Sequence, residues 1–207
     1  MRVKIKGIEQ LYQLYLKEGE KLTTEQIAAH CEITKKTLFN RYQSRQNLED
    51  QLIEYWKHCF YSTLKKKVEN ANNQIEALLY FIDQFKKSVV EEQVFFRLEE
   101  KDYLKPALLH GNFFVHVVEY LIQKGIQEKL FKAEVDPKTY SICIIFNLFH
   151  LFYYPDKRET LSYPQLNRDQ TLRYVITLVQ ILLTPEGEKS FEMISIDQFM
   201  GIIISNE

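Results

Sequence analysis

The fold is decided by the stretch Ile27-Ala28-Ala29-His30-Cys31-Glu32-Ile33-Thr34-Lys35-Lys36-Thr37-Leu38-Phe39-Asn40-Arg41-Tyr42. Thr23 stands three residues before Gln26, which is the spacing of a capping box, and Thr34 can cap a second short helix. The small Ala28 permits two helices to cross closely, and apolar residues on both sides of the turn can lock them together. The pattern predicts a helix-turn-helix unit whose outer face, residues 34–42, is free to enter a major groove.

The sequence around this unit is also helical in its spacing. Apolar residues between Ile5 and Leu16 recur at helical intervals, and Gly19 follows where a left-handed cap is expected. Ser44 can cap a long helix that ends at the polar residues 70–73. Further helices are expected near 74–90, 92–104, 106–124, 136–154 and 167–184, with breaks at prolines and at Gly125. For the tail, residues 186–207, a last helix and a strand-like segment both remain open.

Charge is distributed unevenly along the chain. The net charge is -1, yet residues 1–45 hold nine Lys or Arg against five Glu, which leaves 18 basic and 23 acidic residues for the remainder. A basic head on an acidic body is typical of a protein that brings only its head to DNA phosphates. No segment has the roughly 18 uninterrupted apolar residues of a membrane span, and no signal peptide is recognisable. We therefore expect a cytoplasmic protein without membrane contact.

Residues 27–48 resemble the DNA-binding domain of the tetracycline-repressor (TetR) family of bacterial regulators. The family pattern of an apolar residue and Ala, then Gly-Val-Ser, Thr-Leu-Tyr, an aromatic, Ser-Lys and Leu is met with conservative replacements. Residues 125–131 and the following Asp136-Pro137 resemble the segment before that family's dimerisation helices. The resemblance implies an all-α protein, with a three-helix helix-turn-helix DNA-binding domain at 1–47 and a helical ligand-binding and dimerisation domain at 48–207.

Two residues in the motif depart from the family pattern. Glu32 replaces the usual turn glycine, so the turn must either avoid positive φ or adopt a conformation that is costly for a side chain. Phe39 replaces the usual Tyr and lacks the hydroxyl that family members offer to a phosphate. Neither change removes the motif, and both bear on affinity and sequence preference.

The chemistry of the motif divides its polar residues into two groups. Side chains on the first turns of the second helix suit base edges or phosphates, while those at helix starts and at the rim suit the phosphate backbone. The alternative is that the basic residues form a merely solvated face. The positions that we expect to contact double-stranded DNA are Thr23, Thr34, Lys35, Lys36, Thr37, Phe39, Asn40, Arg41, Tyr42 and Arg45.

The body of the chain is rich in Phe and Tyr, most of which must form its core. Several rings together with occasional histidines could enclose an apolar pocket, and the resemblance implies a small apolar or aromatic effector there. The expected pocket residues are Phe95, Phe96, Phe113, His116, Tyr120, Phe146, Phe149 and His150. His110 and His116 are six residues apart on one predicted helix and do not form a metal site. We expect no metal, no cofactor, no catalytic residue and hence no enzyme, since no phosphate loop or nucleophile motif is present.

Segments 136–154 and 167–184 are apolar around much of their circumference. Two copies of this pair would form a four-helix interface, as the resemblance also implies, and a twofold dimer matches a palindromic operator. The hypothesis is a ligand-responsive regulator, usually a repressor, that binds DNA as a homodimer. Two rivals remain: a regulator that acts through a protein partner with weak or no DNA binding, and an all-helical enzyme that uses the aromatic pocket.

Overall fold

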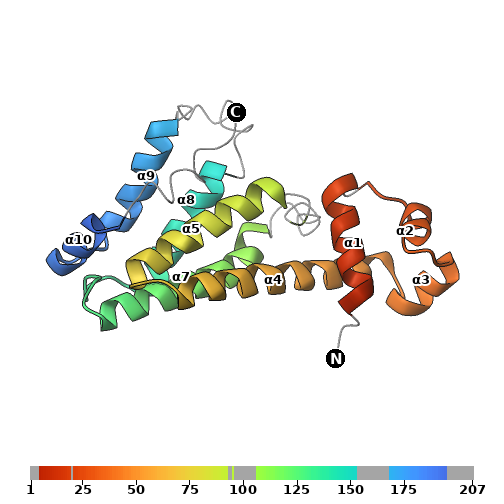
Figure 1. Cartoon of the computed structure of the whole chain (residues 1–207), viewed down its shortest axis with the longest axis horizontal. Coiled ribbons are helices and arrows are strands. Elements are labelled where there is room, and N and C mark those ends of the chain that lie inside the picture. The colour runs from red at the N-terminus through yellow and green to blue at the C-terminus, as the bar shows by residue number, and fades with distance from the viewer. Residues whose placement is uncertain (1–4, 20, 93–94, 96–105, 153–167, 195–207) are drawn as a thin grey trace. The chain divides into compact units, whose positions relative to one another are not determined.

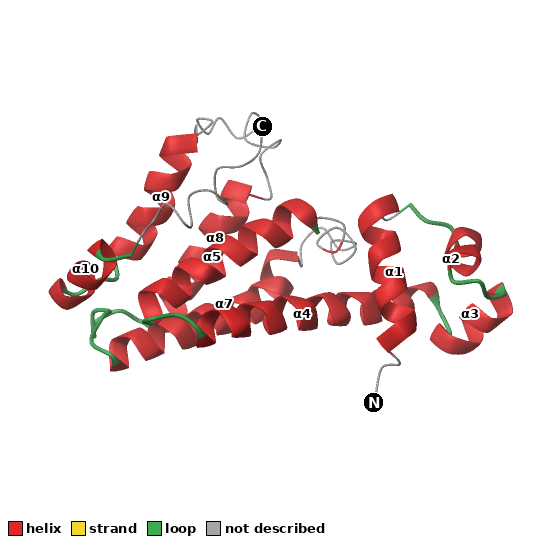
Figure 2. Cartoon of the chain, viewed as in Figure 1, coloured by secondary structure: helices red, strands yellow, loops and turns green. Residues whose placement is uncertain are grey.

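The regular elements of the protein are helices throughout the part that the structure describes (Figures 1 and 2). The structure is a computed structural model, and it describes all residues except 1–4, 20, 93–94, 96–105, 153–167 and 195–207. The helices are α1 (Ile5–Glu18), α2 (Thr24–His30), α3 (Lys35–Tyr42), α4 (Arg45–Glu69), α5 (Gln74–Glu91), α7 (Pro106–Gln127), α8 (Pro137–Phe152), α9 (Arg168–Gln180) and α10 (Pro185–Glu192). The predicted all-α class is confirmed.

The chain divides into two compact units. Unit 1 comprises residues 1–63 and 91–103, and unit 2 comprises residues 64–90 and 104–207. Helix α4 therefore contributes residues to both units. Unit 1 is also discontinuous in sequence, because a segment that follows α5 returns to it.

Unit 1 folds around the three N-terminal helices and the first part of α4. Its core is apolar and includes Ile8, Leu11, Tyr15, Ile27, Leu38, Leu48, Leu52 and Trp56, each at most 4% exposed. Gly19 ends α1 with a φ of 79°, and its N–H donates to the Tyr15 carbonyl over 2.9 Å. This is the left-handed cap that the sequence predicts.

The returning segment is fastened to unit 1 by a buried polar and aromatic cluster. The Trp56 indole donates a hydrogen bond to Glu92 over 2.7 Å, and the Tyr12 hydroxyl donates to the other oxygen of the same carboxylate. Phe95 stacks on Tyr12 with ring centroids 4.8 Å apart and lies 6.0 Å from the Trp56 ring. Burial and the nearby carboxylate raise the pKa of Tyr12, so its hydroxyl remains a proton donor.

Unit 2 has an aromatic core. Phe85 lies edge-on to Phe114 and Phe149, each at a centroid distance of 5.0 Å, and Phe81 stacks beside Phe85 at 6.0 Å. These rings come from α5, α7 and α8, so their contacts join three helices.

A tight corner joins the end of α7 to the segment between α9 and α10. Helix α7 runs through Gly125 to Gln127, so the predicted break at Gly125 is wrong. The break comes two to three residues later, where Lys129 has a φ of 60°. The N–H groups of Lys129 and Leu130 donate to Ile126 and Gly125 over 3.0 and 2.9 Å, which is a Schellman motif. A Cβ on Gly125 would lie 2.1 Å from Cδ2 of Phe131, so the glycine serves packing, not helix termination.

The same corner anchors α10. Thr184 caps α10 through its hydroxyl, and its N–H donates to the Leu130 carbonyl over 3.0 Å. Residues 185–192 are therefore helical; for the tail, the sequence had left a helix and a strand-like segment open. Residues 195–207 lie outside the described residues, as does most of the predicted 92–104 helix. Among the helices described, none combines the length and apolar character that crossing a bilayer requires.

Candidate nucleic-acid interface

Helices α2 and α3 form the predicted helix-turn-helix. The Thr23 hydroxyl accepts from the Gln26 N–H over 3.2 Å and the Gln26 side chain accepts from the Thr23 N–H over 2.7 Å, so the capping box is present. Thr34 caps α3 by accepting from the Thr37 N–H over 3.1 Å. Both predicted helix starts are confirmed.

The turn between the two helices is a second Schellman motif. The Glu32 N–H donates to Ala29 over 3.1 Å and the Ile33 N–H donates to Ala28 over 3.0 Å. Glu32 has a φ of 54°, so the turn keeps the left-handed conformation that glycine would adopt without strain. Glu32 therefore does not avoid positive φ; it adopts the conformation that is costly for a residue with a side chain.

Helix α3 buries one side and exposes the other. Leu38 and Tyr42 are 4% and 5% exposed and pack in unit 1. The exposed side chains are those of Lys35, Lys36, Thr37, Phe39, Asn40 and Arg41. The hydroxyl of Thr34, also exposed, lies 2.9 Å from that of Thr37. We call residues 35–37 and 39–41 the α3 face; it offers two lysines, an arginine, an amide and a hydroxyl on one surface, suited to base edges and phosphates.

Three basic residues of the predicted interface are already engaged within unit 1. Lys35 pairs with Glu25 of α2. Arg45 donates to the Leu22 carbonyl and to the Glu49 carboxylate, each over 2.5 Å, and lies over the Tyr15 ring.

Arg41, the third, lies against α1. Its Nη1 would be 2.7 Å from a Cβ placed on Gly7, so the absence of a side chain at residue 7 makes room for the guanidinium. The Tyr42 hydroxyl would lie 3.8 Å from the same Cβ and is thus close to the guanidinium, while burial raises the pKa of Tyr42. Tyr42 thus supports Arg41 from the core side.

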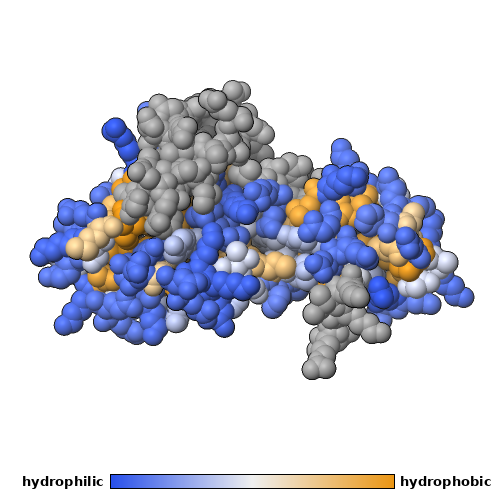
Figure 3. Space-filling view, in the orientation of Figure 1, coloured by the Kyte–Doolittle hydropathy of each residue, from blue (hydrophilic) through white to orange (hydrophobic). Residues whose placement is uncertain are grey.

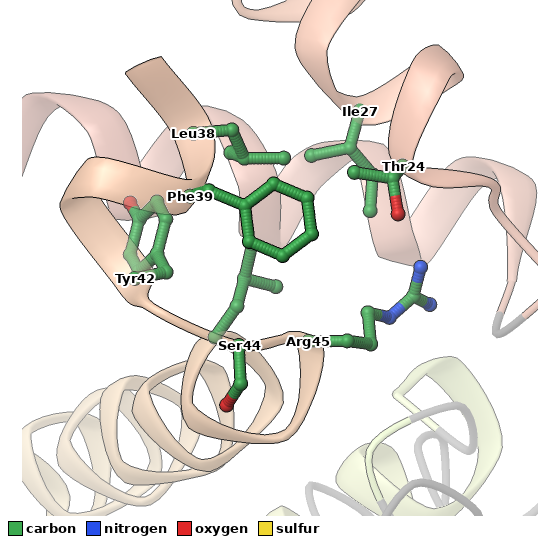
Figure 4. Close-up of a pocket in the computed structure, with 8 residues that line it drawn as sticks. Thr24, Ile27, Leu38, Phe39, Tyr42, Ser44 and Arg45 are labelled. Atoms are coloured by element: carbon green, nitrogen blue, oxygen red, sulfur yellow. The ribbon is translucent and has the colours of Figure 1, made fainter. Parts of the chain in front are cut away.

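A shallow hollow lies beside Phe39 (Figure 4). The hollow has a volume of about 20 Å³ and is lined by Thr24, Ile27, Leu38, Phe39, Tyr42, Ser44, Arg45 and Leu48. Sequence reasoning missed Thr24 here and recognised Ser44 only as a helix cap, which it is, since its hydroxyl accepts from the Asn47 N–H over 3.0 Å. The adjacency of Thr24 to the predicted cap Thr23 was the one available signal.

Solved structures of similar fold cover most of the chain. The TetR family protein CprB from Streptomyces coelicolor is 12% identical, with a TM-score of 0.63 and coverage of 97% of this chain and 96% of CprB. The fatty acid degradation regulator FadR from Bacillus halodurans is 13% identical, with a TM-score of 0.61 and coverage of 87% and 97%. The chain has the TetR-family fold. The sequence itself matches no family model and no curated protein.

Two further TetR-fold structures carry a binding partner. CprB has been solved in complex with its biological operator sequence, and that structure has a TM-score of 0.61, 12% identity and coverage of 94% of this chain and 95% of CprB. RolR has been solved with resorcinol, with a TM-score of 0.57, 12% identity and coverage of 97% and 92%. CprB is bound to DNA in its complex, and RolR is bound to a small aromatic molecule.

The expected effector residues lie in different environments of this TetR fold. Phe149 is buried in the ring cluster of unit 2, and Phe113 is half-buried beside Phe114 at 5.2 Å. His116 is exposed and lies 3.5 Å from Glu119. Tyr120 and Phe146 are 55% and 68% exposed. Among these five expected residues, the exposed fraction of the side chain thus differs widely.

The other three expected effector residues are placed as follows. Phe95 belongs to unit 1, where it stacks on Tyr12. His150 is described only as part of α8, and Phe96 lies outside the described residues.

Sequence reasoning missed a polar group in the body. The Ser88 side chain is fully buried in α5, and its hydroxyl has no hydrogen-bond partner among the residues that the structure describes. Ser88 follows Phe85 by three residues and so lies on the same side of the helix as the ring cluster. A buried hydroxyl without a partner costs about 1–3 kcal/mol, which makes Ser88 a candidate to orient a bound molecule.

Proposed function

We propose that the protein is a TetR-type transcriptional regulator that binds a double-stranded operator through the α3 face. The observation that carries this proposal is the crossing of two capped short helices that leaves Lys36, Thr37 and Asn40 exposed side by side on α3. Such a face fits a major groove, where lysine and asparagine can read base edges. Basic residues in excess over acidic ones in residues 1–45 favour association with phosphate.

Lys36 offers the cleanest test. It is exposed, and no ion pair or hydrogen bond is described for it, whereas Lys35 and Arg45 also hold unit 1 together. Duplexes selected from a random pool, or taken from DNA beside the protein's own coding region, would be titrated by fluorescence anisotropy. Lys36→Ala should weaken binding about 5- to 150-fold, as expected for one lost base contact worth roughly 1–3 kcal/mol.

A lysine elsewhere on the surface is the matched control. Lys65 of α4 belongs to unit 2, outside the helix-turn-helix; its side chain is 59% exposed and pairs with Glu69, four residues further along the same helix. Lys65→Ala should leave the affinity unchanged. If the two substitutions changed the DNA affinity equally, with unaltered circular dichroism, the α3 face would not be the DNA interface.

A protein partner is the second candidate for the α3 face. Phe39 is 52% exposed on it, and Lys35 is paired with Glu25 and thus less available to phosphates. Salt distinguishes the two candidates, because affinity for DNA falls steeply with salt when counterions are released. Binding of selected duplexes that is absent at low salt would favour the protein partner.

We further propose that the body binds a small apolar or aromatic effector and that the protein is a homodimer. The ring cluster around Phe85 supports an effector near α5, as does the Ser88 hydroxyl, which no described residue engages in a hydrogen bond. Ile142 and Phe146 lie one turn apart on α8 and are 49% and 68% exposed, which supports an apolar contact with a second copy. The effector would alter DNA affinity by a coupling of about 1–3 kcal/mol, which is typical of such regulators.

A further inference from the structure

We propose that Phe39 is a specificity-determining residue that makes an apolar contact with the C5 methyl group of a thymine in the operator. The inference rests on the proposed function, since it needs the α3 face to enter DNA. It goes beyond that function by naming a base and one of its groups.

The exposure of Phe39 is the first observation. Its side chain is 52% exposed and stands among Lys35, Lys36 and Asn40 on the α3 face. Exposure of a large apolar ring to water is unfavourable, and an exposed ring within a polar surface is typical of a contact site. Phe39 has no hydroxyl and so offers no hydrogen bond to a phosphate.

The surroundings of the ring are the second observation. In Figure 4 the Phe39 ring extends from α3 towards Ile27 and Thr24 of α2, with Ser44 and Arg45 at the start of α4 below it. The hollow at the ring, about 20 Å³, has room for a group the size of a methyl or a water molecule. Small-molecule sites measure roughly 300–1,000 Å³, so an independent ligand does not fit. Figure 3 shows apolar surface over α1–α3 interrupted by hydrophilic side chains, which suits a small apolar contact within a polar interface.

The position of Phe39 on the helix is the third observation. Lys36 and Asn40 point away from the buried Leu38 and Tyr42, whereas Phe39 lies on the flank with Lys35, one turn earlier. A side chain on the flank of a recognition helix reaches the base edges that lie beside the groove wall, and not those at the centre of the groove. Thymine is the one base that presents a methyl group in that groove. Ring and methyl are thus matched in chemistry and in place.

Replacement of thymine by uracil tests the contact, because it removes only the methyl group. In the best selected duplex, each thymine would be replaced singly by uracil and the affinity of the full-length protein measured. One thymine per half-site should show a loss of about fourfold for the wild type, the equivalent of about 0.8 kcal/mol for one buried methyl. With Phe39→Ala the same replacement should have no effect, because the partner ring is gone.

Lys36→Ala is the matched control for this coupling. It should weaken binding to the thymine and uracil duplexes alike and so preserve their fourfold ratio. The inference is overturned if no uracil replacement weakens binding by the wild type, or if the affinity ratio between the thymine and uracil duplexes persists in Phe39→Ala. Phe39 then contacts no thymine methyl group. If no duplex is preferred over random DNA, the proposed function fails instead, and the inference fails with it.

Discussion

At the scale of single residues, the two positive φ values that matter most lie at the ends of helices. Glu32 and Lys129 each occupy the left-handed position of a Schellman motif, with φ of 54° and 60°. A residue with a Cβ pays roughly 1–2 kcal/mol in this conformation. The hydrogen bonds of the motif and the packing of the following residue outweigh that cost.

Glu32→Gly should stabilise unit 1. Glycine adopts the observed φ without strain, which recovers about 1–2 kcal/mol, while the greater freedom of glycine in the unfolded chain removes about 0.4–1 kcal/mol. The expected net gain is about 0.5–1 kcal/mol in the free energy of unfolding. Urea titration followed by circular dichroism measures it.

Two control variants test whether backbone strain causes this gain in stability. Glu32→Asn should give a smaller gain, because Asn tolerates the left-handed region better than Glu. Glu54→Gly, at an exposed position inside α4, should instead destabilise by about 1 kcal/mol. A loss of stability in Glu32→Gly would show that the left-handed conformation is not a source of strain.

Residue by residue, the sequence predicted the caps of the motif better than the roles of its charges. The hydroxyls of Thr23, Thr34 and Ser44 each accept from the N–H three positions ahead, so local spacing was sufficient. Lys35 is paired with a residue ten positions away, and Arg45 with a carbonyl 23 positions away. Such pairings depend on how helices cross, which no local pattern specifies.

At the scale of elements, the corner between α7 and Phe131 is the place where propensity and packing oppose each other. Ala is about 1 kcal/mol more favourable than Gly within a helix, yet Cβ at residue 125 would meet the Phe131 ring. This conflict explains why the predicted break was wrong. Glycine commonly ends helices, and nothing in the neighbouring sequence reveals that a ring lies against it.

Gly125→Ala should destabilise unit 2 by about 1–3 kcal/mol, the usual cost of overpacking a core. Thermal or urea unfolding measures the change. Phe131→Leu, which makes room for the added methyl, should cost less in the Gly125→Ala background than in the wild type. A gain of stability in Gly125→Ala would mean that helix propensity prevails and that the ring moves aside.

The helices themselves could be predicted largely from periodicity and caps. The expected segments 74–90 and 136–154 correspond to α5 and α8 with shifts of no more than two residues at their ends. The exposed side of each helix could not be predicted in the same way. Phe146 and Phe149 are three residues apart on α8, but one is exposed and the other buried. Which side of an apolar helix faces the core depends on its neighbours.

At the scale of the whole molecule, the exposed apolar side chains of α8 bear on assembly. Tyr174 of α9 donates a hydrogen bond to Asn147 of α8, so the two helices are joined within unit 2. Ile142 and Phe146 lie on the outer surface of α8, and Ile181 is exposed just after α9. A second copy placed there would remove these side chains from water.

Phe146→Asp should therefore weaken self-association at least about 100-fold. Each copy loses the burial of one Phe, worth about 1.5–3 kcal/mol, and twofold symmetry counts the loss twice. Sedimentation velocity across a range of protein concentrations measures it. Tyr120→Asp, at an aromatic residue of similar exposure on α7, is the control and should leave the assembly unchanged. A wild type that is monomeric at high concentration would exclude the proposed homodimer.

The carboxylate of Glu92 has a consequence for any attempt to exchange the DNA-reading part with that of another protein. Tyr12 and Trp56 both donate to it, and Phe95 stacks on the Tyr12 ring. Glu92 and Phe95 nevertheless lie more than 35 residues after Trp56 in the sequence. A graft cut at residue 47 would carry Tyr12 alone, and one cut at residue 63 would carry Tyr12 and Trp56, but both would lack Glu92 and Phe95. The transplantable cassette is thus not a continuous stretch of sequence, and a chimera that keeps the head intact must bring residues 91–95 with it.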